Sequence, residues 1–200
     1  MKKITILLAI AIISLGLVGC SDQSSDSHKS KHHSDNKHHS IHNTKIPKKI
    51  FSKTDKDKDI SKPTMKKDIK LYLDSDRKLT DALEPYQDKI SSEKKLSKKQ
   101  LNKFKHIVDL QHKNNHRFDE YINNNSLPNH KYELYTKKIN DYTAHVDQLY
   151  KKELNIAKEG NSVKKASKLA DTDKNVNGKE QKQIEDFLKE EDIKTIAYDK

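Results

Sequence analysis

The chain has 200 residues, of which 41 are lysine or arginine and 30 are aspartate or glutamate, with four glycines and one cysteine. This length allows one modest domain plus non-globular sequence, and four glycines are too few for a β-sandwich or a nucleotide-binding α/β fold, so the composition favours an all-α fold. A single cysteine excludes an intramolecular disulfide framework and a zinc site made of four cysteines.

The first 19 residues have the pattern of a secretion signal. Lys2 and Lys3 precede an apolar run over residues 4–18, which is followed by Gly19 and Cys20. As a helix, the run is about 22 Å long, which is shorter than the roughly 30 Å hydrocarbon core that a membrane-spanning helix crosses. We therefore predict a signal peptide over residues 1–19 that is cleaved rather than retained.

The tetrad that ends this run, Leu17-Val18-Gly19-Cys20, resembles the lipobox of bacterial lipoproteins. The resemblance implies cleavage after Gly19 and diacylation of Cys20, and two acyl chains hold a protein on a bilayer almost permanently. We therefore expect a lipid-anchored protein on the extracellular face of the bacterial cell membrane. There, a net charge of about +9 without the signal peptide favours lipid headgroups, an anionic cell-wall polymer or a protein partner, and the location argues against nucleic acid.

Residues 20–63 have the composition of a disordered tether that starts at the lipidated cysteine. The 42 residues from Ser21 to Lys62 hold five large apolar side chains, too few to offset the entropy lost in ordering a backbone. The five are Ile41, Ile46, Ile50, Phe51 and Ile60. A flexible coil of this length spans roughly 35 Å, so we expect the domain to lie just above the headgroups.

A histidine tract within the tether predicts an alternative function, the capture of zinc or another transition metal. Its six members are His28, His32, His33, His38, His39 and His42. Imidazole suits zinc, copper and nickel, so a disordered tract of this kind can collect a metal ion without forming a rigid site. The plainer interpretation is a solvated spacer whose rings titrate near neutral pH.

Two amphipathic segments follow the tether. The first has apolar residues at alternating spacings of four and three, and Pro85 within it predicts a kink or a restart of the helix. The second opens with a capping box, in which the Ser97 hydroxyl accepts from the amide of Gln100 while the Gln100 side chain reaches back. This second helix is expected to end at the three asparagines of residues 123–125.

A third amphipathic segment begins after Pro128 and stops at Gly160, which we expect to be the C′ glycine of the helix. If the first two segments fold back about residues 91–96, residues whose numbers sum to 187 lie at the same level. The apolar pairs are Met65 with Ile122, Ile69 with Phe118, Leu79 with Val108, Leu83 with Phe104 and Tyr86 with Leu101. We therefore expect residues 64–170 to form an antiparallel three-helix bundle, or a helical hairpin plus a third helix.

Residues 171–200 are expected to form a turn, a short helix and a tail. Lys179–Glu190 is predicted to be helical, with Ile184, Phe187 and Leu188 on one side, and residues 162–170 are expected to add a helical turn or two before it. The aspartate-rich and asparagine-rich stretch 171–178 resembles a calcium loop at first sight. Its glycine and its final acid do not fall at the required positions together, so a turn is the better interpretation.

Polar residues interrupt the apolar stripes of the bundle and are the candidates for a buried site. They are Asp76, Gln111, Asn115 and Glu153. Polar groups in a helix core need partners, so these residues line a small ligand pocket or form a layer that fixes the register, with Tyr142 or His145 approaching from the third helix. The register role is the better attested of the two.

His112 and His116 on the second helix have the four-residue spacing of a metal clamp, with Asp119 one turn further. The residue after His112 is Lys113, so the general-base glutamate of the His-Glu-x-x-His metalloproteases is missing. Two surface histidines are the commoner explanation, because a helix with several histidines often places two of them four apart.

The helical body resembles the NDxxF-motif lipoproteins of staphylococci. Asn114-Asn115-His116-Arg117-Phe118 carries the motif, and Leu127-Pro128 and Asn177-Gly178-Lys179-Glu180 follow it. Asn115 stands where the family has aspartate. The resemblance implies a lipoprotein with a helical body similar to cell-wall-binding lipoproteins, but no established activity. In the predicted hairpin Asn115 faces Tyr72 and Phe118 faces Ile69, so the motif residues Asn114, Asn115 and Phe118 are expected to pack at least as readily as to bind.

The sequence therefore predicts a non-catalytic helical interaction module at the cell envelope. The chain has no recognisable Ser-His-Asp context, glycine-rich phosphate loop or paired-carboxylate motif, so we expect neither an enzyme nor a cofactor other than zinc at the histidine tract. An accessory enzyme of cell-wall turnover is the weaker alternative.

Overall fold

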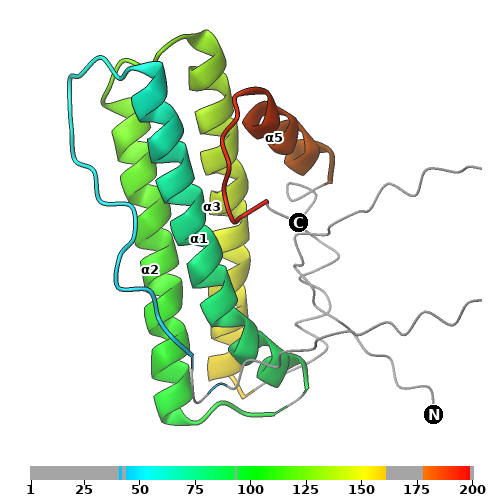
Figure 1. Ribbon diagram of the computed structural model, residues 1–200. Helices are drawn as coiled ribbons and strands as arrows, with labels where there is room; N and C mark the ends of the chain where they lie inside the picture. The colour runs from blue at the N-terminus through cyan, green and yellow to red at the C-terminus, as the bar shows by residue number, and fades with distance from the viewer. Residues whose placement is uncertain (1–40, 42–43, 93, 161–177, 199–200) are drawn as a thin grey trace, which may run out of the picture.

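The computed structural model describes residue 41 and residues 44–92, 94–160 and 178–198. Within these ranges the chain forms four α-helices and no β-strand: α1 (Lys62–Ser91), α2 (Lys98–Asn123), α3 (His130–Lys158) and α5 (Gly178–Glu190). The first three form an antiparallel bundle, and α5 packs beside it (Figure 1). The predicted all-α fold, with three long helices and a short C-terminal helix, is confirmed.

The register of the α1–α2 hairpin is the predicted one. The side-chain amide of Gln111 donates to Asp76, and the Tyr72 hydroxyl donates to Asn115 Oδ1 at 2.8 Å, so in both pairs the residue numbers sum to 187. Both contacts lie in the middle of the helices. The spacing of the apolar residues in the two segments, together with the loop between them, was therefore enough to predict the register of α1 against α2.

The helix ends follow from short-range chemistry. The predicted capping box is present at Ser97 and Gln100, and the Asn129 side chain accepts from the Tyr132 amide to start α3. Gly160 follows the last helical turn with a φ of 90°, a left-handed conformation that glycine adopts without strain.

Pro85 does not end α1 or make it restart. The helix continues as one element to Ser91. Its last turns bend away from the axis of the rest of the helix, so the predicted kink is present and the predicted restart is not (Figure 1). The flanking Leu83 and Tyr86 are fully buried, and Tyr86 stacks on Phe104 with ring centroids 5.7 Å apart. Packing against α2 therefore holds the segment helical despite the backbone donor that proline lacks.

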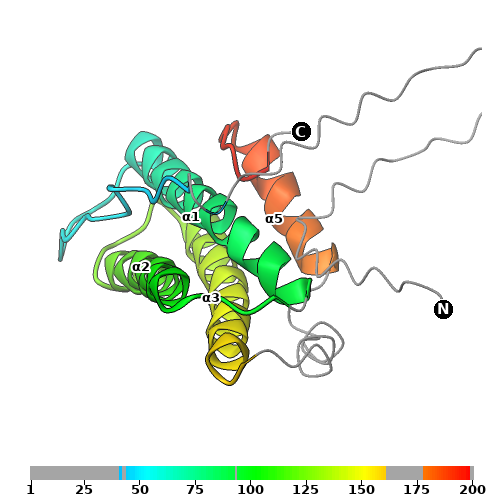
Figure 2. The same ribbon diagram turned by 90° about the horizontal axis from the view of Figure 1, so that it is seen from below.

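The segment before α1 corrects the boundary of the expected tether. Residues 44–61, which we call the strap, lie along the bundle beside α1 and α2, on the side away from α5 (Figures 1 and 2). Phe51 is fully buried against the rings of Tyr72, Phe118 and Tyr121. Burial of one large aromatic side chain, together with polar contacts along the helices, outweighs the polar composition that predicted disorder.

The C-terminal segment packs on the opposite side of α1, against α3. Ile184, Phe187 and Leu188 form the predicted buried face of α5, and Phe187 stacks on Tyr135. Just after the helix, Glu191 binds lysines of both α1 and α3. The bundle is thus flanked by the strap on one side and by α5 on the other.

Several predictions concern residues outside the described ranges. These are the lipobox with Gly19 and Cys20, the six histidines of the tract, the turns expected over residues 162–170 and the stretch 171–177. In the part of the chain that the structure describes, no helix combines the length and the apolar character needed to cross a bilayer.

Candidate functional site

The motif residue Asn114 holds the backbone of the strap. Its Oδ1 atom accepts a hydrogen bond from the Phe51 amide at 2.9 Å, and its Nδ2 atom donates to the Tyr72 carbonyl at 3.4 Å. One turn further along α2, Arg117 donates to the Phe51 carbonyl at 3.4 Å. The backbone amide and carbonyl of Phe51 are therefore both bound by side chains of the motif segment.

Of the other two motif residues, Asn115 binds the neighbouring helices and Phe118 contacts the Phe51 ring. Asn115 is buried, accepts from the Tyr72 hydroxyl and donates to the Thr143 carbonyl of α3 at 3.3 Å. The Phe118 ring stacks on Tyr72 with centroids 4.0 Å apart and meets Phe51 edge-on at 5.2 Å. The motif residues thus join α1, α2, α3 and the strap, and their contacts within the described residues are packing contacts.

Further contacts hold the strap to the far end of α2. The Lys53 ammonium lies 2.7 Å from Asp68 of α1, a buried carboxylate that also accepts from the Tyr121 hydroxyl at 2.6 Å. Beyond this point the strap exchanges backbone hydrogen bonds with the turn after α2, and Asn125 binds it through both ends of its side-chain amide. The strap is therefore held at several points between Phe51 and Ile60 rather than at one aromatic anchor.

A polar layer crosses the bundle next to the motif, formed by Asp76, Gln111 and Asp147 from the three long helices. The Asp76 carboxylate accepts from Gln111, and burial together with the negative charge of Asp147 raises the pKa of Asp76 to about 7. Gln111 Oε1 and Asp147 Oδ1 are buried without a hydrogen-bond partner among the described residues. Such acceptors are typical positions for an internal water.

The outer edge of this layer includes His112, one of the two α2 histidines that have the spacing of a metal clamp. His112 Nδ1 lies 3.1 Å from Asp147 Oδ2 and 2.9 Å from the Lys151 ammonium, whereas His116 faces Glu120 at 3.3 Å. The two histidines therefore turn to different partners, and Asp119 instead binds Asn140 of α3. Over the described ranges there is no group of three or more histidine, cysteine or acidic side chains that could hold a metal ion.

The fourth polar interruption, Glu153, does not join the layer. It is buried near the end of α3 and accepts from Gln87 of α1 at 2.8 Å. Burial raises the pKa of Glu153 to about 7. The predicted interruptions thus form three separate sets of contacts, because Asn115 binds Tyr72 and Thr143 rather than the layer. From α3, Asp147 acts on Asp76 through its charge. In the described residues, neither Tyr142 nor His145 hydrogen-bonds to any of the four interruptions.

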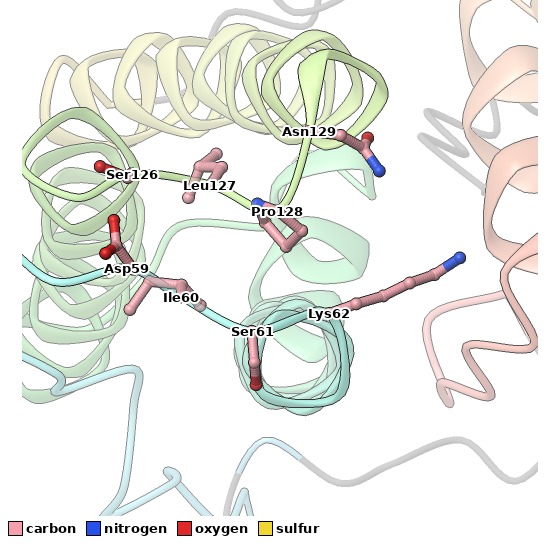
Figure 3. Close-up of a pocket in the computed structure, with 8 residues that line it drawn as sticks. All are labelled: Asp59, Ile60, Ser61, Lys62, Ser126, Leu127, Pro128 and Asn129. Carbon is pink, nitrogen blue, oxygen red and sulfur yellow. The ribbon is translucent and has the colours of Figure 1, made fainter.

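A hollow of about 450 Å³ lies where the strap meets the starts of α1 and α3 (Figure 3). Its lining residues are Asp59, Ile60, Ser61, Lys62, Ser126, Leu127, Pro128 and Asn129. Ser61 and Asn129 are the N-caps of their helices, and the Lys62 side chain extends away from the hollow to pair with Glu191. Three chain segments meet at this hollow, and their polar groups are already engaged in helix capping and in an ion pair that stabilise the fold.

A second hollow, of about 630 Å³, lies on the first turns of α2. Its lining residues, which we call the lysine flank, are Lys98, Lys99, Asn102, Lys103 and His106. All five come from one helix, so no opposing wall encloses a small molecule. The surface instead offers a row of basic side chains, three of the five lining residues being lysine and one histidine.

Sequence reasoning did not find the lysine flank or the strap. The flank was visible as the run Lys98-Lys99 and Lys103 within the second helix, but so many lysines are present that no single run is distinctive. The strap was signalled only by a few apolar residues in a polar stretch, Phe51 and the isoleucines at positions 46, 50 and 60, which follow no helical or strand period.

Comparisons of the chain with protein-family models, with curated protein sequences and with solved structures gave no match.

Proposed function

We propose that the protein is a lipid-anchored, non-catalytic interaction module on the outer face of the cell membrane, and that its basic surface binds an anionic polymer of the cell wall. The observation that carries the binding proposal is the lysine flank. Lys98 and Lys99 are exposed, and they start a helix that presents Lys103 and His106 on the same side. An open row of cations suits a long, repeatedly charged chain better than a compact ligand.

The anchor in this proposal is supported by the sequence. The basic start, the apolar run and the Leu17-Val18-Gly19-Cys20 tetrad match the requirements for export and diacylation. An exported basic domain held at the membrane meets wall polymers and headgroups rather than cytoplasmic nucleic acid. The proposal of a non-catalytic module is supported by the contacts of the buried acids Asp68, Glu153 and Glu191, each of which binds neighbouring helices.

Binding of the mature protein to isolated cell walls tests the polymer proposal. We expect binding at low ionic strength that weakens as salt screens the charges, and a loss of about tenfold or more when Lys98, Lys99 and Lys103 are all changed to glutamine. A matched control changes three exposed lysines elsewhere, Lys67, Lys78 and Lys137, by the same substitution. Equal losses in the two triple variants would show that net charge, rather than the flank, governs binding.

Metal capture by the histidine tract is the alternative, and it stays a prediction from the sequence. Calorimetric titration of the mature chain with zinc tests it, because replacing the six histidines by serine should abolish the heat of binding. No heat with the unaltered chain would exclude this function.

A further inference from the structure

The strap determines which end of the bundle is joined to the N-terminal part of the chain. It runs antiparallel to α1, with Thr44 beside the Tyr86 hydroxyl, Phe51 against Tyr72 and Lys53 against Asp68. The chain therefore reaches the bundle where α1 ends and α2 begins, and not where α1 starts at Lys62 (Figure 1). A tether that ended at residue 63 would have attached the opposite end.

The end reached by the strap is basic. We define the basic end by three exposed lysines: Lys45 at the start of the strap, Lys95 in the α1–α2 connection and Lys158 in the last turn of α3. Lys95 extends to Gly160 just beyond α3, so the connection and the end of α3 share one surface. Among the described residues, the exposed acids nearby are Asp88 and Glu159, with Glu84 one turn earlier in α1. The lysine flank continues the positive charge along α2.

We propose that the basic end faces the membrane and contacts the anionic headgroups of the bilayer in which Cys20 is anchored. This inference rests on the proposed function for the anchor, and it assigns a partner to a surface distinct from the flank. Only 20 residues separate Cys20 from Ile41, and even fully extended they span no more than about 70 Å. The anchor thus holds the basic end at a high local concentration of headgroups.

The charge of the basic end and its distance from the bilayer determine the orientation of the domain. Each lysine near an anionic bilayer strengthens binding to that bilayer about fivefold. This electrostatic attraction falls off within a Debye length of roughly 8 Å at physiological salt. The three lysines of the basic end can act together only when this end points at the bilayer. In that orientation the lysine flank stands beside the membrane, and Lys56 and Lys58, at the other end of the strap, point away from it.

Lysine footprinting on vesicles tests this orientation without depending on natural lipidation. Cys20 is the only cysteine, so the mature chain can be coupled through its thiol to a maleimide lipid. The vesicles contain phosphatidylcholine with or without about 30 % phosphatidylglycerol. Acetylation of each lysine is then measured by mass spectrometry. We expect at least threefold slower acetylation of Lys45, Lys95 and Lys158 on the anionic vesicles, and unchanged rates at Lys56 and Lys58.

Two further arms separate the alternatives. Changing Lys45 and Lys158 to glutamate should abolish the protection of Lys95 on anionic vesicles, because the remaining charge no longer orients the end. Equal rates on neutral and anionic vesicles would overturn the proposal, and so would protection of Lys95 by added wall polymer alone. Failure of the flank variants to lose wall binding would instead contradict the polymer function and leave this orientation standing.

Discussion

The side chain of Asn114 accepts a hydrogen bond from the backbone amide of Phe51, 63 residues earlier in the chain. Through this bond a residue of α2 fixes a segment that, on composition, belongs to the tether. The folded unit therefore begins at least as early as residue 44, and its connection to the N-terminus leaves from the end of the bundle that carries Lys95 and Lys158.

The first prediction concerns the aromatic anchor of the strap. Phe51→Ala removes a fully buried ring and leaves a cavity between Tyr72, Phe118 and Tyr121, so we expect the free energy of unfolding to fall by about 3–5 kcal/mol. Urea denaturation measures the loss, and hydrogen exchange should show faster exchange over residues 44–60. Lys49→Ala, at an exposed position of the same segment, should change the stability by less than about 0.5 kcal/mol.

The second prediction concerns Asn115, at which the NDxxF motif that this segment resembles has aspartate. In Asn115→Asp a carboxylate oxygen replaces the Nδ2 atom that donates to the Thr143 carbonyl, which puts two acceptors together in a buried site. We expect a loss of about 1–3 kcal/mol at neutral pH. The loss should shrink as the pH falls, because a protonated carboxyl can donate to the carbonyl again. A loss that is the same at pH 4 and pH 8 would contradict this explanation.

The third prediction is the pH dependence of stability. The pKa of Asp76 is raised to about 7 in the folded protein, so between the ordinary carboxyl pKa of about 4 and pH 7 the folded state binds more protons than the unfolded state. The free energy of unfolding should therefore fall as the pH rises across this window, and Glu153, with a pKa of about 7, adds to the fall.

Asparagine at position 76 keeps the acceptor for Gln111 but cannot ionise. Thermal melts of Asp76→Asn should consequently show a weaker pH dependence between pH 4 and 7 and a higher stability at pH 8 than the unaltered protein. Asp81→Asn serves as the control, because Asp81 is an exposed acid paired with Arg77 on the same helix. If both variants keep the original pH profile, Asp76 is not the titrating group.

The fourth prediction concerns the docking of the C-terminal segment. Glu191 is buried, accepts from the Tyr132 hydroxyl at 2.7 Å and pairs with Lys62 and Lys131, and the hydrogen bond from Lys131 is the largest of the effects that lower its pKa to about 2. This pairing stabilises the fold above the ordinary pKa of glutamate and is lost as the pH falls towards 2.

Glu191→Gln should therefore destabilise the protein by about 1–3 kcal/mol at neutral pH, with the fastest hydrogen exchange appearing over residues 184–197. Glu190→Gln is the matched control, since the Glu190 side chain is largely exposed and pairs with Lys131, which also pairs with Glu191. Exchange that rises equally in the two variants would show that Glu191 does not hold the segment.

Local and periodic features were the predictable part of the fold. The capping box at Ser97, the C′ glycine at Gly160 and the buried face of α5 each depend on a few neighbouring residues, and the hairpin register depends on the period of two stripes. The partners of Asp76 and Asn115 on the facing helix followed from that register.

Contacts between distant segments were not predictable from the same patterns. Phe51 gives no periodic signal, and its socket exists only once α1 and α2 are paired. Asp147 and Glu191 are charged residues that a stripe analysis assigns to the surface, but lysines and a histidine from other elements allow their burial. The role of each of these residues depends on its contacts in the folded protein rather than on its neighbours in the sequence.

Attachment of the chain to the membrane through Cys20 underlies both the proposed function and the proposed orientation. Mass spectrometry of the native protein extracted from cell membranes tests this most directly. We predict an N-terminal peptide that begins at Cys20 and carries two acyl chains on its sulfur-linked glyceride. A released protein with a free Cys20 thiol, or a chain that still begins at Met1, would contradict both the anchor and the orientation that depends on it.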